Sequence, residues 1–191
     1  SESDIADLKA TTRFVTWQGI EPDKWATLWL IKRHIRPDAY LILVQPNAVL
    51  PADAYAVGVP ESSIRRDRRE SMFRRLKRAM AIKSPELNYL DALIHDVEVN
   101  IWEAPSHPHA DWFELMYREL QARYGRDQVP VDCYLAFFDK VSLLSYDPAL
   151  KAADYMKRHD LETTCPGRKV SDAWIPQQSH LEILREISLG K

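Results

Sequence analysis

The sequence predicts an α+β fold, a mostly helical single domain with a small sheet near the N-terminus. Two segments of strand composition, 13–17 and 40–44, enclose a stretch in which apolar residues recur at helical spacing. From about residue 61 onward the apolar residues recur at helical spacing. A chain of 191 residues with 46% hydrophobic and 28% charged residues has the size and composition of one globular domain with a buried core.

The first expected helix is Asp23–Arg36, because Pro22 stands where a helix start tolerates proline and Pro37 ends the pattern. A weaker strand is expected at 54–57. Ser84-Pro85 is typical of a helix start, and that helix is expected to reach about residue 97. The other expected helices are 62–81, 111–124, 131–144, 148–159 and 180–188.

The whole chain, 1–191, is expected to form one domain. Its parts are an α/β part at 13–60, a helical part at 61–160 and an irregular tail at 161–191 with a short helix. The alternative is two subdomains divided near Pro60.

The charge is unevenly distributed. The formal net charge is −2, but Arg65–Arg78 holds eight basic residues and two acids. If this segment is helical, its paired arginines share one face and suit an oxyanion, because a guanidinium gives two parallel hydrogen bonds. The commoner interpretation of such a run is a solvated helix face with Asp67 and Glu70 as counter-ions. Nucleic acid is a possible but disfavoured partner, because the rest of the chain is acidic.

Other patterns restrict the location and the cofactors. No apolar run approaches the ~20 residues of a membrane span. The polar, acidic first residues predict a cytoplasmic protein, with export after removal of a signal as the alternative. Cys133 and Cys165 are expected to be two buried thiols, or a disulfide if the protein is exported. No glycine-rich phosphate loop is present in the sequence, and no cofactor is predicted.

Two segments carry a resemblance to a known family. Residues 23–39, Asp-Lys-Trp-Ala-Thr-Leu-Trp-Leu-Ile-Lys-Arg-His-Ile-Arg-Pro-Asp-Ala, are similar to the signature of the chromate-resistance ChrB-like domain. Residues 84–98 resemble its second conserved helix, which ends in a His-Asp pair. The resemblance covers about residues 13–145. It implies a bacterial α+β domain linked to chromate resistance and stress, with some members proposed as chromate-responsive regulators and some as exported proteins.

The sequence also departs from that family. Between the two segments the resemblance leads us to expect a His and a Cys, but Arg66 and Ser71 stand at those positions. A serine hydroxyl is neither a soft metal ligand nor a reductant, and the arginine shifts the region towards anion chemistry. The resemblance therefore transfers no catalytic residue, and whether the protein is an enzyme stays open.

We expect a ligand site where the start of the Asp23–Arg36 helix meets the basic segment and the His-Asp pair. A helix N-terminus and clustered arginines favour an anion, and a histidine beside an aspartate adds a titratable group whose pKa the carboxylate would raise. The Arg69→Ala variant is expected to lose ligand stabilisation. The candidate ligand-binding residues are Asp23, Lys24, Arg33, Arg66, Arg69, His95 and Asp96.

The predicted function is an oxyanion-responsive or binding protein, whose partner is a small oxyanion or another polar small molecule. One alternative is a small metal-dependent enzyme that uses His95 with His107 or His109. Against it, the two later histidines flank Pro108 in a segment expected to be an exposed loop, and no metal site is predicted. The second alternative is a nucleic-acid-binding module through Arg65–Arg78. The oligomeric state is left open.

Overall fold

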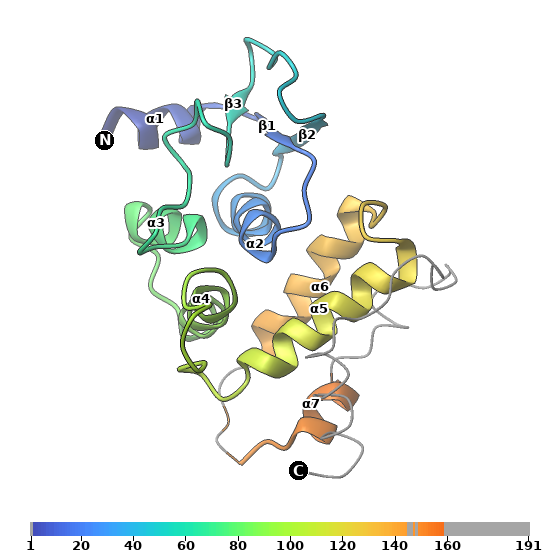
Figure 1. Cartoon of the computed structure of the whole chain (residues 1–191). Helices are drawn as coiled ribbons and strands as arrows, with labels where there is room; N and C mark the ends of the chain where they lie inside the picture. The colour runs from blue at the N-terminus through green and yellow to red at the C-terminus, as the bar shows by residue number, and fades with distance from the viewer. Residues whose placement is uncertain (1, 145–146, 148, 159–191) are drawn as a thin grey trace. The chain divides into compact units, whose positions relative to one another are not determined.

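The computed structural model describes residues 2–144, 147 and 149–158 (Figure 1). The chain forms two compact units, Ser1–Lys83 (unit 1) and Ser84–Lys191 (unit 2). The helix at 72–79 falls in unit 1, where it packs against the helix at 22–30. The described helices far outnumber the short strands, which confirms the α+β prediction.

A three-stranded parallel sheet organises unit 1. Its strands are β1 (Arg13–Trp17), β2 (Tyr40–Val44) and β3 (Tyr55–Ala56), in the order β2-β1-β3. Val15 of the central strand pairs with Ile42 on one side and Ala56 on the other. All three predicted strands are therefore confirmed, and their carboxyl ends meet at one edge of the sheet.

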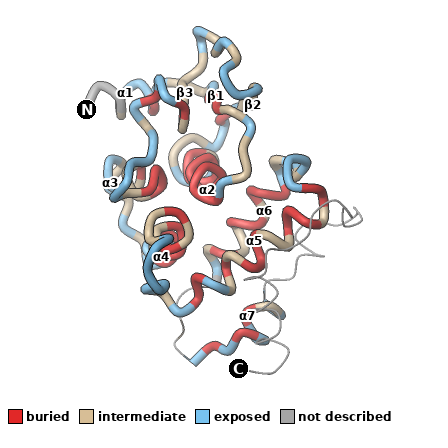
Figure 2. Tube along the Cα trace, viewed as in Figure 1, coloured by how far each residue is buried: buried red, intermediate tan, exposed pale blue. Residues whose placement is uncertain are grey.

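The crossover from β1 to β2 is the helix α2 (Pro22–Leu30), followed by the π-helix η1 (Ile31–Ile35). Every residue of α2 is buried, as the red coil in Figure 2 shows. The amide of Arg36 donates to the carbonyl of Ile31 at 2.7 Å, a five-residue spacing. The sequence predicted a continuous helix and gave no sign of this wider last turn.

Unit 1 also contains α1 (Glu2–Ala10), which the sequence analysis missed, and α3 (Met72–Ala79). The prediction of a helix over 62–81 is wrong for its first half, which is a loop. Within that loop Asp67 Oδ1 accepts hydrogen bonds from the amides of Arg69 at 2.8 Å and Glu70 at 2.9 Å. Such local side-chain bonds compete with helix formation. Ser71 then caps α3, since its Oγ accepts from the amide three residues on.

The described part of unit 2 contains helices joined by loops, and no strand. Its helices are α4 (Pro85–Glu98), α5 (Ala110–Tyr124), α6 (Val131–Leu144) and α7 (Ala152–Arg158). α4 packs against α5 and α6, and α5 packs against α7. The first three agree with their predicted ranges to within a residue or two. The last is shorter than its predicted range, and the predicted helix at 180–188 lies outside the described residues.

Two further expectations concern single features. Cys133 on α6 is buried and is disulfide-bonded, so the favoured expectation of a free thiol is wrong for this residue. Its partner lies outside the described residues. Within residues 2–144 and 149–158, no helix has both the length and the apolar composition needed to cross a membrane.

Candidate functional site

A cavity of about 430 Å³ opens at the carboxyl edge of β1 and β3 in unit 1. In parallel sheets ligands bind outside the carboxyl ends of strands, at the point where the strand order reverses. The order β2-β1-β3 reverses between β1 and β3, which is where this cavity lies. The lining residues come from the end of β1, the start of α2, the turn after β3, the basic loop and α3: Trp17, Glu21, Asp23, Lys24, Gly58, Val59, Pro60, Arg65, Arg66 and Met72.

Lys24 contributes a cation fixed at the end of the central strand. Its side chain is largely buried, with 7% of the residue exposed, and its Nζ donates to the carbonyl of Trp17 at 2.8 Å. Burial lowers the pKa of Lys24, while the nearby carboxylate of Glu21 acts in the opposite direction. The end of the strand therefore holds the amine in place, and a charge that enters the cavity would shift the pKa of Lys24.

Gly58 allows the turn after β3 to close the other side of the cavity. Its φ of +64° lies in the left-handed region that side chains rarely adopt. A Cβ added there would lie 3.0 Å from Cε of Met72. The glycine therefore permits both the turn and the close approach of α3.

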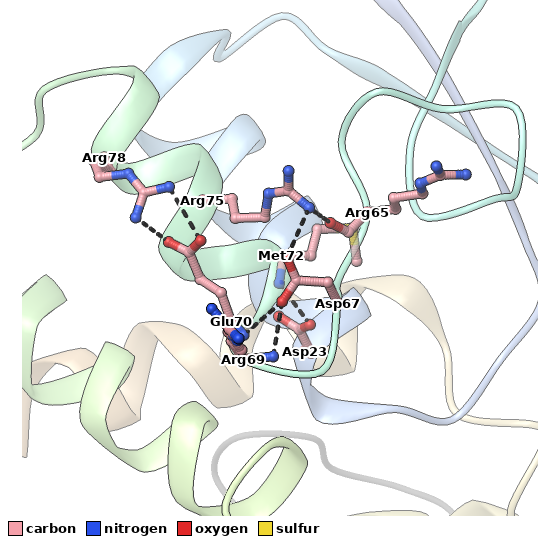
Figure 3. A network of polar contacts seen from close by, with 8 residues as sticks. All are labelled: Asp23, Arg65, Asp67, Arg69, Glu70, Met72, Arg75 and Arg78. Carbon is pink, nitrogen blue, oxygen red and sulfur yellow. Dashed lines mark hydrogen bonds and ion pairs between the residues drawn. The ribbon is translucent and has the colours of Figure 1, made fainter.

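Asp23 lines the same cavity, but its carboxylate is already hydrogen-bonded to backbone amides. The residue is 1% exposed, and one carboxylate oxygen accepts from the amide of Met72 at 2.8 Å (Figure 3). The other accepts from the amide of Phe73 at 2.9 Å. A carboxylate on the first amides of a helix is favourable, because those amides have no partner within the helix. Asp23 thus joins α2 to α3 and fixes the end of the basic loop.

The basic segment Arg65–Arg78 divides into two groups. The arginines of α3 pair with the acids of the loop, Arg75 with Asp67 at 3.5 Å and Arg78 with Glu70 (Figure 3). These are the internal counter-ions that the sequence suggested.

The arginines at the start of the loop have a different position. Arg65 donates from Nη1 to the carbonyl of Pro60 at 2.6 Å, and its own carbonyl accepts from Arg75 Nη1 at 3.0 Å. Arg65 and Arg66 both line the cavity. The loop is therefore held by two hydrogen bonds at Arg65, and it contributes two arginines to the cavity that Lys24 also lines.

Other predicted ligand-binding residues of unit 1 lie elsewhere. Arg33 belongs to η1, nine residues beyond Lys24, which corresponds to roughly 14 Å along the helix axis. Arg69 is exposed in the loop and is not among the residues that line the cavity. The sequence analysis missed Trp17, Glu21 and Arg65. The position of two of them was the available signal, because Trp17 ends the central strand and Glu21 directly precedes the helix that follows it.

His95 and Asp96 belong to α4 of unit 2, so their predicted meeting with the basic segment stays a prediction. Asp96 holds the loop after α4. Its Oδ2 accepts from the amide of His107 at 2.6 Å, and its Oδ1 accepts from the amide and hydroxyl of Ser106. Burial raises the pKa of Asp96, but these bonds, with one from Asn100, together hold it below its ordinary value.

The two later histidines lie in the loop between α4 and α5, as the sequence predicted, but neither residue is exposed. His109 is 1% exposed, and its Nδ1 is 2.8 Å from the hydroxyl of Tyr89. The amide of His109 donates to Nδ1 of the half-buried His107 at 3.0 Å. One ring nitrogen of each histidine is therefore engaged within unit 2. Among the described residues, no group of three His, Cys, Asp or Glu side chains is placed to hold a metal ion.

A family model described as ChrB, C-terminal domain, matches residues 14–144. The chain belongs to the ChrB C-terminal domain family. The match begins in β1 and ends with α6, so it covers the sheet, the cavity and most of the helical unit. It confirms the resemblance drawn from the two segments, and the chain is a protein of the chromate-resistance type. Searches of curated proteins and of solved structures find no match.

Proposed function

We propose that this ChrB-family domain binds a small tetrahedral oxyanion, chromate or an analogue, at the carboxyl edge of its sheet. The observation that carries the proposal is the position of Lys24, Arg65 and Arg66 around one cavity. In this role the domain acts as an oxyanion-responsive or binding protein in bacterial chromate resistance.

The chemistry of the lining supports an anion. A guanidinium offers a planar pair of N–H donors to one oxyanion, and an ammonium adds a compact positive charge. The cavity has three cationic side chains, and of its two carboxylates that of Asp23 is already bound to the amides of α3. The indole N–H of Trp17 is buried and finds no acceptor among the described residues. The site therefore has an excess of positive charge and of donors.

Titration calorimetry and thermal melts test the proposal. Sulfate, phosphate and chromate should each be compared with chloride at equal ionic strength, and at least one oxyanion should raise the melting temperature beyond chloride. Arg66→Ala should weaken that binding by about tenfold or more, as expected for loss of a charge-assisted hydrogen bond.

Matched controls come from the same loop. Arg68→Ala removes an exposed arginine that does not line the cavity and should bind as wild type. Arg69→Ala distinguishes two hypotheses: the site proposed at the cavity predicts no loss of oxyanion binding, and the site expected from the sequence predicts a loss. If Arg66→Ala binds as tightly as Arg68→Ala, the proposed site is wrong. Retardation of DNA with a steep salt dependence would instead support a nucleic-acid function.

A further inference from the structure

We propose that Glu21 makes the cavity selective for oxyanions that carry a proton, such as hydrogen phosphate, over sulfate, which carries none at neutral pH. This inference rests on the oxyanion site proposed above. It assigns to Glu21 a discriminating role that is distinct from the attraction supplied by the cations.

The first argument is position. Glu21 lines the same cavity as Lys24, Arg65 and Arg66, although it is negative. A Cβ added at Gly19 would lie 2.4 Å from Oε2 of Glu21 and 3.0 Å from Nζ of Lys24. The carboxylate and the ammonium therefore both reach the space that the missing side chain of Gly19 leaves open.

The second argument is that Glu21 is not used to hold the fold as Asp23 is. Glu21 occupies the N-cap position of α2, but its side chain makes no capping hydrogen bond. It is exposed, whereas Asp23, two residues later, is buried on two amides. The Glu21 carboxylate is thus placed beside the cations without a structural bond to the helix that it precedes.

The third argument is the chemistry of a carboxylate in an anion site. An ionised carboxylate only accepts hydrogen bonds. Hydrogen phosphate, hydrogen arsenate and hydrogen chromate each have an O–H group that can donate to it, and a charge-assisted bond of this kind is strong. Sulfate has no such group, so its oxygens would face the carboxylate with repulsion and no bond. Selectivity then comes from the weaker binding of sulfate, which the carboxylate repels.

Calorimetry at pH 7 and constant ionic strength tests this with inorganic phosphate and sulfate as probes. In the wild type, phosphate should bind at least about tenfold tighter than sulfate, the size expected for one hydrogen bond to a charged group. In Glu21→Gln the side-chain amide can donate as well as accept, so sulfate should gain affinity. The ratio should then fall to within about threefold, since the amide serves both anions.

Glu61→Gln is the matched control. Glu61 is an exposed carboxylate close in sequence to the arginines, and it does not line the cavity. The variant changes the net charge by the same amount and should keep the wild-type ratio. Glu21→Ser, which retains a side chain suited to the N-cap, gives the same prediction as Glu21→Gln if the glutamine variant folds poorly.

The outcomes separate this inference from the proposed function. If wild type binds sulfate as tightly as phosphate, or if the Glu21 variants keep the wild-type ratio, the selective role is overturned while the oxyanion site stands. If neither phosphate nor sulfate binds the wild type, this inference is overturned, and if chromate also fails to bind, the oxyanion site is wrong as well.

Discussion

Replacing Asp23 by asparagine should destabilise unit 1 strongly. The carboxylate is 1% exposed and accepts from the amides of Met72 and Phe73 at 2.8 and 2.9 Å. Asparagine keeps one acceptor oxygen and turns an NH₂ group towards the other amide, which leaves a buried donor unpaired at a cost of about 1–3 kcal/mol. Loss of the negative charge at the start of α3 adds about 0.3–1 kcal/mol. The expected loss is therefore about 1–4 kcal/mol in the free energy of unfolding.

Urea unfolding followed by circular dichroism measures that loss, and amide hydrogen exchange locates it. Exchange at Met72 and Phe73 should become at least about tenfold faster, because each 1.4 kcal/mol corresponds to a factor of ten. Asp38→Asn is the control, since its carboxylate is exposed and pairs with Arg36 at the surface. It should cost less than about 1 kcal/mol. If Asp23→Asn costs no more than Asp38→Asn, the capping argument is refuted.

Two further predictions concern unit 2. Burial lowers the pKa of His109 below 6.5, so the folded state binds fewer protons than the unfolded chain and stability should fall as the pH drops below 6.5. His109→Phe should weaken this dependence in thermal melts between about pH 8 and 5, and an unchanged slope would contradict the assignment. The hydrogen bonds to Asp96 hold its pKa below 3.8, so its stabilisation should be present at neutral pH and be lost as the pH falls through the folded-state pKa. Asp96→Asn should hasten proteolysis of the loop at 100–107 at pH 7, and cleavage at the wild-type rate would argue against its anchoring role.

Local signals in the sequence predicted most of the fold. The strands β1 and β2 and the helix α6 have the predicted bounds, because alternating or helical apolar patterns and flanking prolines mark their ends. The helix predicted over 62–81 began about ten residues before the observed start of α3 at Met72. The basic residues of this segment have good helix propensity. The Asp67 carboxylate, however, accepts hydrogen bonds from the amides of the residues that follow it, and this competes with helix formation in a way that helix propensity does not include.

The site was harder to predict because it depends on contacts between distant segments. Lys24 and Arg66 were identified by charge and by their place in the family-like segment. Arg65 and Glu21 join them only because the strand order reverses between β1 and β3, which no local pattern reveals. The burial of His109 likewise depends on its contact with Tyr89, twenty residues earlier in the chain.

The bond from Asp23 to the start of α3 also sets the smallest piece of this protein that can exist alone. A chain cut near Pro60 would keep the whole sheet and α2, but it would leave the Asp23 carboxylate without the two amides it binds. An uncompensated buried charge costs several kcal/mol, a large part of the stability of a small domain. Truncation should therefore keep the residues up to Lys83 together, because the sheet and the basic loop belong to one compact unit.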